Sequence, residues 1–260
     1  MTSSVDLNCD MGESFGAYRI GADAAVFPYI SSANIACGYH GGDPTVMRTT
    51  VEEAQRRGVA IGAHPGLPDL IGFGRRTMDV TPTETYDMFV YQIGALLGFA
   101  KAAGVEMQHV KAHGAIYNMA AAKPDLASAI ARAVRDVDAG LLMFGLPGSP
   151  LITEAEALGL ATASEAFADR NYMPDGSLVS RRRPDAQVHD ADEAVRRAIR
   201  MVREGKVRAI DGNDIDIRAD TICIHGDGPH AAEFARALHE AFEADGIEIR
   251  APGRGVASEH

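Results

Sequence analysis

The chain alternates short apolar runs with longer segments of helical pattern along nearly its whole length. The apolar runs are too short to be helices and lack strict polar–apolar alternation, which is typical of parallel strands covered on both faces. This alternation predicts right-handed βαβ units and a parallel sheet. The predicted strands are Val5–Cys9, Ala33–Cys37, Val59–Ala63, His109–Ala112, Gly140–Phe144, Leu160–Ser164 and Thr221–Ile224, with Ile247–Ile249 as a shorter last one.

The ends of the helices are marked by capping residues. Asp43 precedes Pro44, which suits the first position of a helix, and the helical pattern stops at Gly58. The segment Thr81–Glu84 combines a cap, a first-position proline and a capping box, and its helix ends at Gly104. The same devices recur at Pro124, Pro150, Pro229 and Asp190.

About seven strand–helix units in 260 residues fit a closed, somewhat irregular barrel better than an open sheet. No low-complexity linker or shift in composition divides the chain. We therefore predict an α/β fold with a single (β/α) barrel domain over residues 1–260. Two long segments, His64–Val80 and Glu165–Val188, interrupt the rhythm after strands, and long ordered loops of this kind are usually functional.

The composition excludes several classes of partner. With 25 Lys and Arg against 36 Asp and Glu, the formal charge of −11 argues against nucleic acid or an anionic membrane as the main partner. The first residues show no signal-peptide pattern and no apolar run is long enough to span a membrane. The three cysteines lack CxxC spacing and are expected to be reduced core thiols. We expect a cytoplasmic protein.

Titratable residues gather directly after the predicted strands. In a parallel barrel the carboxyl ends of all strands meet at one rim, where active sites are built. The opposite loops hold mainly glycine and ordinary charges. The rim residues are Asp10, Glu13, His40, His64, Lys111, His113, Glu165, Asp169, His225 and Asp227.

The first strand carries polar residues on one face. Alternate residues of a strand share a face, so Asp6, Asn8 and Asp10 point one way while Val5 and Leu7 point the other. Two carboxylates and an amide are costly to bury unless they are used. They are expected inside the barrel; the alternative is an edge strand with one wet face.

The histidines and arginines allow more than one interpretation. His40, His64, His113 and His225 converge on the rim, which suits either a metal centre or acid–base chemistry, although no HxxxH or HExxH spacing supports a metal. Arginine forks bind carboxylate or phosphate, and we assign this role to Arg75, Arg76 and Arg170. The run Arg181–Arg183 has the composition of a solvated loop.

Six segments resemble the LamB/YcsF lactam-utilisation family, and they span the chain from its first strand to its last. They are DLNCDMGESFG (6–16), NIACGYHGGDP (34–44), GAHPGLPDLIGFGRR (62–76), VKAHGAIYN (110–118), ADRNYMPDGSLVSR (168–181) and ICIHGDGPHA (222–231). Small departures occur at Leu67, Tyr39, Gly41 and Ala112, none of which is a charged rim residue.

The resemblance implies a seven-stranded barrel of the glycoside hydrolase/deacetylase-like type. It also implies ATP-dependent opening of 5-oxoproline (pyroglutamate) to L-glutamate, together with two partner subunits, B and C. The sequence has no GxxxxGK[ST] motif, so nucleotide handling is expected to lie mainly with the partners, and this chain is expected to open the activated lactam.

Opening a lactam requires a base, donors for the oxyanion and an acid for the leaving nitrogen. The predicted catalytic residues are Asp10, Glu13, His64, Lys111, His113, His225 and Asp227. The predicted substrate-binding residues are Asp6, Asn8, His40, Arg75, Arg76, Glu165, Asp169 and Arg170.

Two other functions stay open from the sequence. One is a stand-alone metal-dependent amidohydrolase or deacetylase, with Asp10, His40 and His64 around Zn²⁺. The other is a non-catalytic subunit of a larger complex, against which the density of titratable groups at the rim argues.

Overall fold

A computed structural model describes residues 4–181, 183–188, 190–224 and 231–253. Seven parallel strands form the barrel, because β1 pairs with β2 on one side and with β9 on the other. This confirms the predicted α/β barrel and its strand count. The strands are β1 (Ser4–Met11), β2 (Ser32–Ala36), β3 (Ala60–His64), β4 (Met107–Lys111), β5 (Leu142–Gly145), β6 (Thr162–Phe167) and β9 (Thr221–Ile224).

The short last strand is also present. It is β10 (Glu248–Ile249), which pairs in parallel with the beginning of β1 through Ser4 and Val5. The order around the sheet is β10-β1-β2-β3-β4-β5-β6-β9, so the strands from β1 to β6 are neighbours in chain order, β9 closes the barrel between β6 and β1, and β10 pairs with β1.

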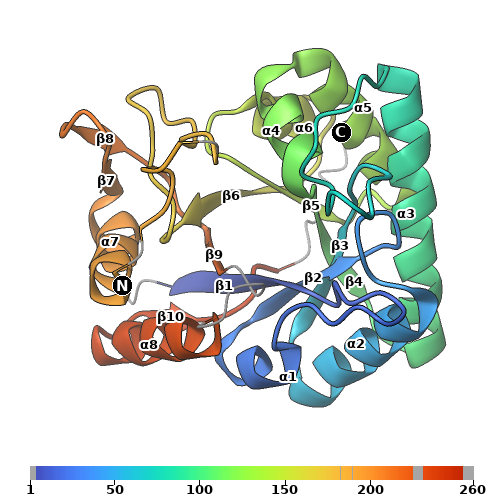
Figure 1. Cartoon of the computed structure of the whole chain (residues 1–260), viewed down its shortest axis with the longest axis horizontal. Helices are drawn as coiled ribbons and strands as arrows, with labels where there is room; N and C mark the ends of the chain where they lie inside the picture. The colour runs from blue at the N-terminus through green and yellow to red at the C-terminus, as the bar shows by residue number, and fades with distance from the viewer. Residues whose placement is uncertain (1–3, 182, 189, 225–230, 254–260) are drawn as a thin grey trace.

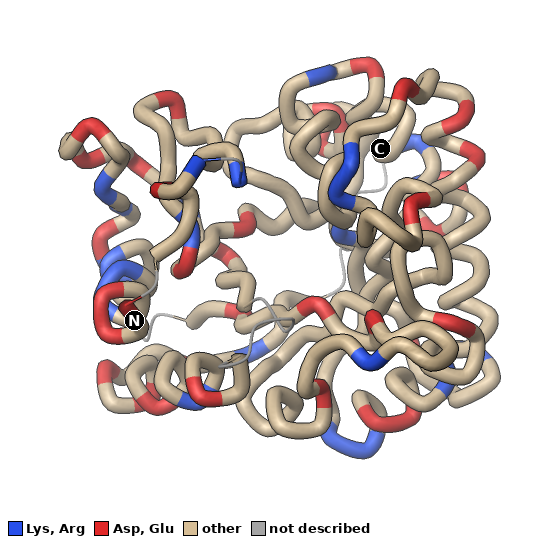
Figure 2. Tube along the Cα trace, in the orientation of Figure 1, with Lys and Arg blue, Asp and Glu red and all other residues tan. Residues whose placement is uncertain are grey.

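Helices surround the outside of the strands (Figure 1). They are α1 (Asp23–Val26), α2 (Pro44–Arg57), α3 (Pro82–Ala103), α4 (Gly114–Ala122), α5 (Pro124–Val137), α6 (Pro150–Ala157), α7 (Ala191–Glu204) and α8 (Ala231–Ala244), with a 3-10 turn, η1 (Phe27–Tyr29), after α1. Acidic and basic residues are interspersed over these helices and the loops in this view (Figure 2). None of the helices in the described part of the chain is both long and apolar enough to span a membrane.

The starts of α2 and α3 have the capping hydrogen bonds that the sequence predicted. Asp43 accepts from the backbone N–H groups of Thr45 and Val46 at the start of α2. At α3, Thr81 and Glu84 form the reciprocal capping box. Gly58 and Gly104 end these two helices in the left-handed conformation, with φ of 70° and 71°, where glycine carries no steric penalty. Pro229 lies outside the described residues.

Three kinds of local structure were not predicted from the sequence. A two-stranded antiparallel hairpin, β7 (Lys206–Arg208) with β8 (Asp214–Asp216), lies between α7 and β9. Helix α4 follows β4 almost directly, and α1 with η1 connects β1 to β2. These segments are short or charged, so they lack the apolar periodicity on which the prediction relied.

The two faces of β1 differ as predicted. Leu7 and Cys9 are fully buried in the apolar core. Asp6 and Asn8 are buried on the other face, and Asp10 pairs with Lys111 of β4, a strand that is not a neighbour of β1. Such a contact crosses the interior of the barrel. The polar face of β1 therefore lines the barrel interior, and the edge-strand alternative is wrong.

Candidate active site

A cavity of about 560 Å³ opens where the barrel strands end. Its wall includes Asp10 of β1, His64 of β3 and Lys111 of β4, each at or near the carboxyl end of its strand. Six of the predicted site residues line it: Asp10, His64, Arg75, Lys111, His113 and Arg170. This is the rim at which the sequence placed the chemistry.

Lys111 is the central cation of the site. Its Nζ donates to Asp10 Oδ1 at 2.7 Å and lies 2.9 Å from Glu165 Oε1, and it also approaches Cys223 Sγ at 3.0 Å. Burial by itself would lower the pKa of Lys111, but Asp10, Cys223 and Glu165 together raise it well above its usual value. Lys111 is therefore a buried ammonium group between two carboxylates.

Asp10 is held so that its two oxygens have different surroundings. Oδ1 accepts from Lys111 Nζ and, at 2.8 Å, from Asn34 Nδ2. Oδ2 lies 3.3 Å from His64 Nε2. One oxygen is thus anchored by the barrel interior while the other faces the histidines.

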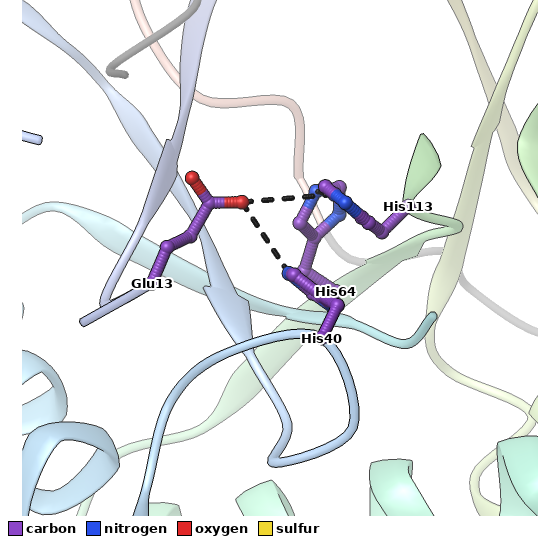
Figure 3. Close-up of side chains that lie close together, drawn as sticks. All are labelled: Glu13, His40, His64 and His113. Atoms are coloured by element: carbon purple, nitrogen blue, oxygen red, sulfur yellow. Dashed lines mark hydrogen bonds and ion pairs between the residues drawn. The ribbon is translucent and has the colours of Figure 1, made fainter. Parts of the chain in front are cut away.

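Three histidines and Glu13 form a compact cluster (Figure 3), and His64 connects this cluster to Asp10. The rings of His40 and His113 are stacked, with centroids 3.6 Å apart and planes 4° from parallel. His64 Nε2 is 2.9 Å from His113 Nδ1. Glu13 Oε1 lies 3.3 Å from His40 Nε2 and 3.6 Å from His113 Nδ1. All four residues are buried.

Glycines make room for this cluster. A Cβ on Gly66 would lie 2.7 Å from His40 Nδ1, and one on Gly74 would lie 2.7 Å from His113 Cδ2. Gly74 also has φ of +64°, which side chains rarely adopt. The glycines of the long segment after β3 therefore let its backbone close over the two stacked rings.

Burial favours the neutral form of the stacked histidines. Burial lowers the pKa of both His40 and His113 well below the usual value, and neighbouring histidines add to this effect. A cluster of imidazoles and a carboxylate has the chemistry of a metal site. One ligand atom from each of Glu13, His40, His64 and His113 can be chosen so that all lie within 4.8 Å of one another, so the cluster could hold a metal ion. Two of the three predicted metal ligands, His40 and His64, belong to it, and the third, Asp10, borders it through His64.

The arginines divide into those at the cavity and those away from it. Arg75 and Arg170 line the cavity, whereas Arg76 is directed at Asp69 and its side chain is 66% exposed. Arg170 donates to the carbonyl oxygens of Val179 and Ala186, and burial lowers its pKa to about 10. Arg181 is exposed, as expected for a solvated loop, but it also lines the cavity, which was not predicted.

Four other predicted residues lie beside or beneath the cavity without lining it. Asp6 and Asn8 are deeper in the barrel, and Glu165 is fully buried against Lys111. Asp169 is half-buried in the segment after β6. His225 and Asp227 lie outside the described residues.

Several residues of the site were missed in the sequence. Asn34 of β2 donates to both Asn8 Oδ1 and Asp10 Oδ1, and its signal was an amide inside an otherwise apolar strand. Tyr117 and Asn118 of α4 and Ser180 also line the cavity. Burial raises the pKa of the Tyr117 hydroxyl well above its usual value, and the charge of Glu165 raises it further.

Comparison with known proteins extends over nearly the whole chain. Residues 5–257 match the LamB/YcsF family. The chain is 59% identical over 249 residues to the 5-oxoprolinase A subunit of Bacillus licheniformis, covering 96% of this chain and 98% of that protein. The corresponding protein of Bacillus subtilis is 58% identical over 247 residues, covering 95% of this chain and 96% of that protein.

Solved structures agree with the fold. The lactam utilization protein of Thermus thermophilus superposes with a TM-score of 0.91 and 51% identity, covering 96% of this chain and all of that one. A T48 deacetylase, at 13% identity and a TM-score of 0.50, covers 95% of this chain and 87% of its own and shares only the fold. The barrel, the six motifs and these similarities lead to one conclusion: the chain belongs to the LamB/YcsF family.

Proposed function

We propose that this chain is the lactam-opening subunit of an ATP-dependent 5-oxoprolinase that forms L-glutamate together with subunits B and C. The proposal is supported by the names of relatives at 57–59% identity, each of which is called the A subunit of 5-oxoprolinase. The name of the Thermus thermophilus protein, a lactam utilization protein, points to the same class of substrate. A hydrolase acting on a cyclic amide fits a rim with a carboxylate, an ammonium group and imidazoles.

The observation that carries the proposal is the pairing of Asp10 with Lys111 at the wall of the cavity. Asp10 Oδ1 is anchored by Lys111 and Asn34, so Oδ2 is the oxygen that can accept a proton from an attacking water. Lys111 is charged and lies next to the Asp10 carboxylate. From there it can stabilise the oxyanion that forms at the lactam carbonyl, or a phosphoryl group attached to the substrate. These two groups supply the base and the electrostatic stabilisation in one place.

The remaining proton has to reach the leaving nitrogen. Water oxygen bonds to the lactam carbon, the carbon–nitrogen bond breaks and the nitrogen takes up a proton, which leaves glutamate. We assign this transfer to the neighbouring Glu13, His64 and His113, because His113 Nδ1 lies 2.9 Å from His64 Nε2 and 3.6 Å from Glu13 Oε1. Arg75 and Arg170, on the cavity wall, are assigned to the carboxylate of the substrate.

The stable amide requires activation, and we assign that step to the partners because this sequence lacks a P-loop. ATP is thus consumed by the complex. We also propose a cytoplasmic location, in line with three buried cysteines that carry no disulfide.

The test is glutamate release from 5-oxoproline and ATP, measured with this chain alone, with subunits B and C alone and with all three. We expect turnover only in the complete mixture. Steady glutamate production by this chain without the partners would contradict the proposed division of labour. Full turnover by B and C without this chain would contradict its catalytic role.

The histidine cluster favours one alternative, a stand-alone metal-dependent amidohydrolase. Such an enzyme would cleave simple amides without ATP and would lose that activity with a chelator. Assaying acetylated amines and lactams with this chain alone, with and without added Zn²⁺, separates it from the ATP-dependent reaction.

A further inference from the structure

The hydrogen bonds of His64 and His113 determine which of their nitrogens carry protons. His64 Nδ1 lies 2.8 Å from the carbonyl oxygen of Lys111, and His113 Nε2 lies 2.7 Å from that of Phe73. A carbonyl oxygen only accepts, so both of these nitrogens are N–H donors. In the neutral rings, His64 Nε2 and His113 Nδ1 therefore carry lone pairs.

These two lone pairs face each other. The nitrogens are 2.9 Å apart, which is hydrogen-bond distance, but neither has a proton to donate when both rings are neutral. Two buried acceptors at this separation repel each other unless a positive charge lies between or beside them. The geometry therefore calls for either a shared proton or a metal cation at this point.

His40 leads to the same point from a third side. Both of its ring nitrogens are buried and make no hydrogen bond within the described part of the chain. Its Nδ1 is turned towards Gly66, and its Nε2 lies 3.3 Å from Glu13 Oε1. Glu13 Oε1 is in turn 3.6 Å from His113 Nδ1, so the carboxylate oxygen joins the three imidazole nitrogens around one position (Figure 3).

We propose that Glu13, His40, His64 and His113 bind one divalent transition-metal ion at the wall of the cavity. Bonds of about 2.0–2.1 Å to a tetrahedral ion place neighbouring ligand atoms about 3.3 Å apart. Three of the six separations, at 2.9, 3.3 and 3.6 Å, lie around this value, and all six are within 4.8 Å. The inference goes beyond the proposed function and revises one part of it, because residues that bind the ion through these atoms cannot also carry the proton to the leaving nitrogen.

The ligand set selects the class of metal. Three imidazoles and one carboxylate suit zinc and the neighbouring divalent metals, whereas Mg²⁺ and Ca²⁺ prefer oxygen ligands. The carbonyl partners of His64 and His113 are the kind of outer hydrogen bond that orients metal-ligating histidines. His64 and His113 also line the cavity, so an ion held by them is within reach of a substrate oxygen, which it could polarise.

The direct test is calorimetric titration of the full chain with Zn²⁺ after treatment with a chelator, together with metal analysis of the protein as purified. We expect one equivalent of Zn²⁺ to bind, with binding weakened as protons compete at acid pH. His40→Gln and Glu13→Gln should each weaken the Zn²⁺ affinity at least about tenfold. His239→Asn is the matched control, because His239 lies in α8 against Tyr29, and it should bind Zn²⁺ like the parent.

A second measurement keeps the test independent of folding. Zn²⁺ should raise the melting temperature of the parent and of His239→Asn, but not that of Glu13→Gln, which retains the shape of the carboxylate side chain. Co²⁺ in the same site should give the visible absorption of a nitrogen-rich four-coordinate ion.

Two results would overturn the proposal. The first is that Zn²⁺, Co²⁺ and Mn²⁺ all fail to bind, which would mean that the two facing nitrogens share a proton instead. Equal affinity in the parent and both cluster variants would overturn it as well. Neither result bears on glutamate release, which tests the proposed function separately.

Discussion

Two groups of buried polar residues lie inside this barrel, and they differ in how their hydrogen-bonding capacity is met. In the deeper group, Asp6 accepts from the hydroxyls of Ser31, Ser32 and Thr221, and Asn8 donates to Thr221. The chain itself satisfies these groups. In the group at the mouth, two lone pairs face each other between His64 and His113, and the ring nitrogens of His40 make no hydrogen bond within the described residues.

The difference separates architecture from function. A buried polar group that the fold satisfies can be explained by the fold alone, because it recovers in hydrogen bonds what it loses in hydration. Buried acceptors that converge on one another have no such explanation, because their mutual repulsion costs free energy in a medium of low dielectric. The mouth is therefore the part of the interior that is built for a ligand, and substitutions in the two groups should have different consequences.

The sharpest contrast is between Asp10→Asn and Asp6→Asn, two changes on the same face of β1. Asp10 faces the cavity, so Asp10→Asn should keep the fold and lower the turnover of the complete complex by about 10²–10⁴, the usual worth of a proton-transfer group. Asp6→Asn should keep most of the turnover. Kinetics and melting temperatures of both variants check this, and a folded Asp10→Asn protein with near-normal turnover would remove the residue from the mechanism.

The histidines at the mouth should act as one unit. His64→Ala and His113→Ala should each lower turnover at least about 10²-fold, and the double variant should lose little more than either single one. The reason is that the two rings share one interaction across 2.9 Å. A double-mutant cycle on glutamate release measures this. Additive losses would show that the two rings act independently, and active variants with lowered melting temperatures would show that the rings are merely structural.

Much of the fold could be predicted because its signals are local. The caps at Asp43 and Thr81 and the apolar strand runs each depend on a few neighbouring residues, and the structure confirms the positions of α2, α3 and the barrel strands to within a few residues. The β7–β8 hairpin was missed because segments such as Lys206–Arg208 and Asp214–Asp216 are three residues long and mostly charged. Their pairing is a tertiary effect rather than a local preference.

The site was predicted as a set of residues but not as an arrangement. That Asp10, His64, Lys111 and His113 meet at one rim follows from the topology of a parallel barrel. The stacking of His40 on His113 does not, because it depends on how the segment containing Gly74 returns across the mouth. The path of this segment also directs Arg75 to the cavity and Arg76 to Asp69. The sequence alone does not distinguish these two adjacent arginines.

The deeper group makes a prediction about pH. Burial raises the pKa of Asp6 to about 6, against 3.8 as its ordinary value, and the hydroxyl hydrogen bonds only partly offset this. The folded state thus binds more protons than the unfolded state between these values, so the contribution of Asp6 to stability is lost as the pH rises through about 6. Asp6→Asn removes this dependence. Urea unfolding at pH 4.5 and 7.5 should show the variant gaining about 2 kcal/mol on the parent, whereas a gap that does not change with pH would contradict the raised pKa.

The smallest expected effects are those of replacing the adjacent arginines Arg75 and Arg76. One of them faces the cavity and the other is already paired within the fold. Arg75 lines the cavity, so Arg75→Ala should raise the KM for 5-oxoproline about tenfold, the worth of one hydrogen bond to a charged group. Arg76 is already engaged by Asp69 on an exposed loop, so Arg76→Ala should leave KM within about twofold. Steady-state kinetics of the complete complex measure both.

Arg181 supplies the outcome that would reverse this assignment. It lines the same cavity from the segment after β6, while Arg183 in the same run pairs with the exposed Asp185. If Arg75→Ala behaves like the parent and Arg181→Ala raises KM, the substrate carboxylate lies against the segment after β6 instead of the one after β3. Arg183→Ala is the matched control, since its guanidinium is held by a neighbour away from the cavity and its loss should leave KM unchanged. Because Arg75→Ala and Arg181→Ala each remove one charge from the cavity wall, comparing their KM values with that of the control locates the anionic end of the substrate.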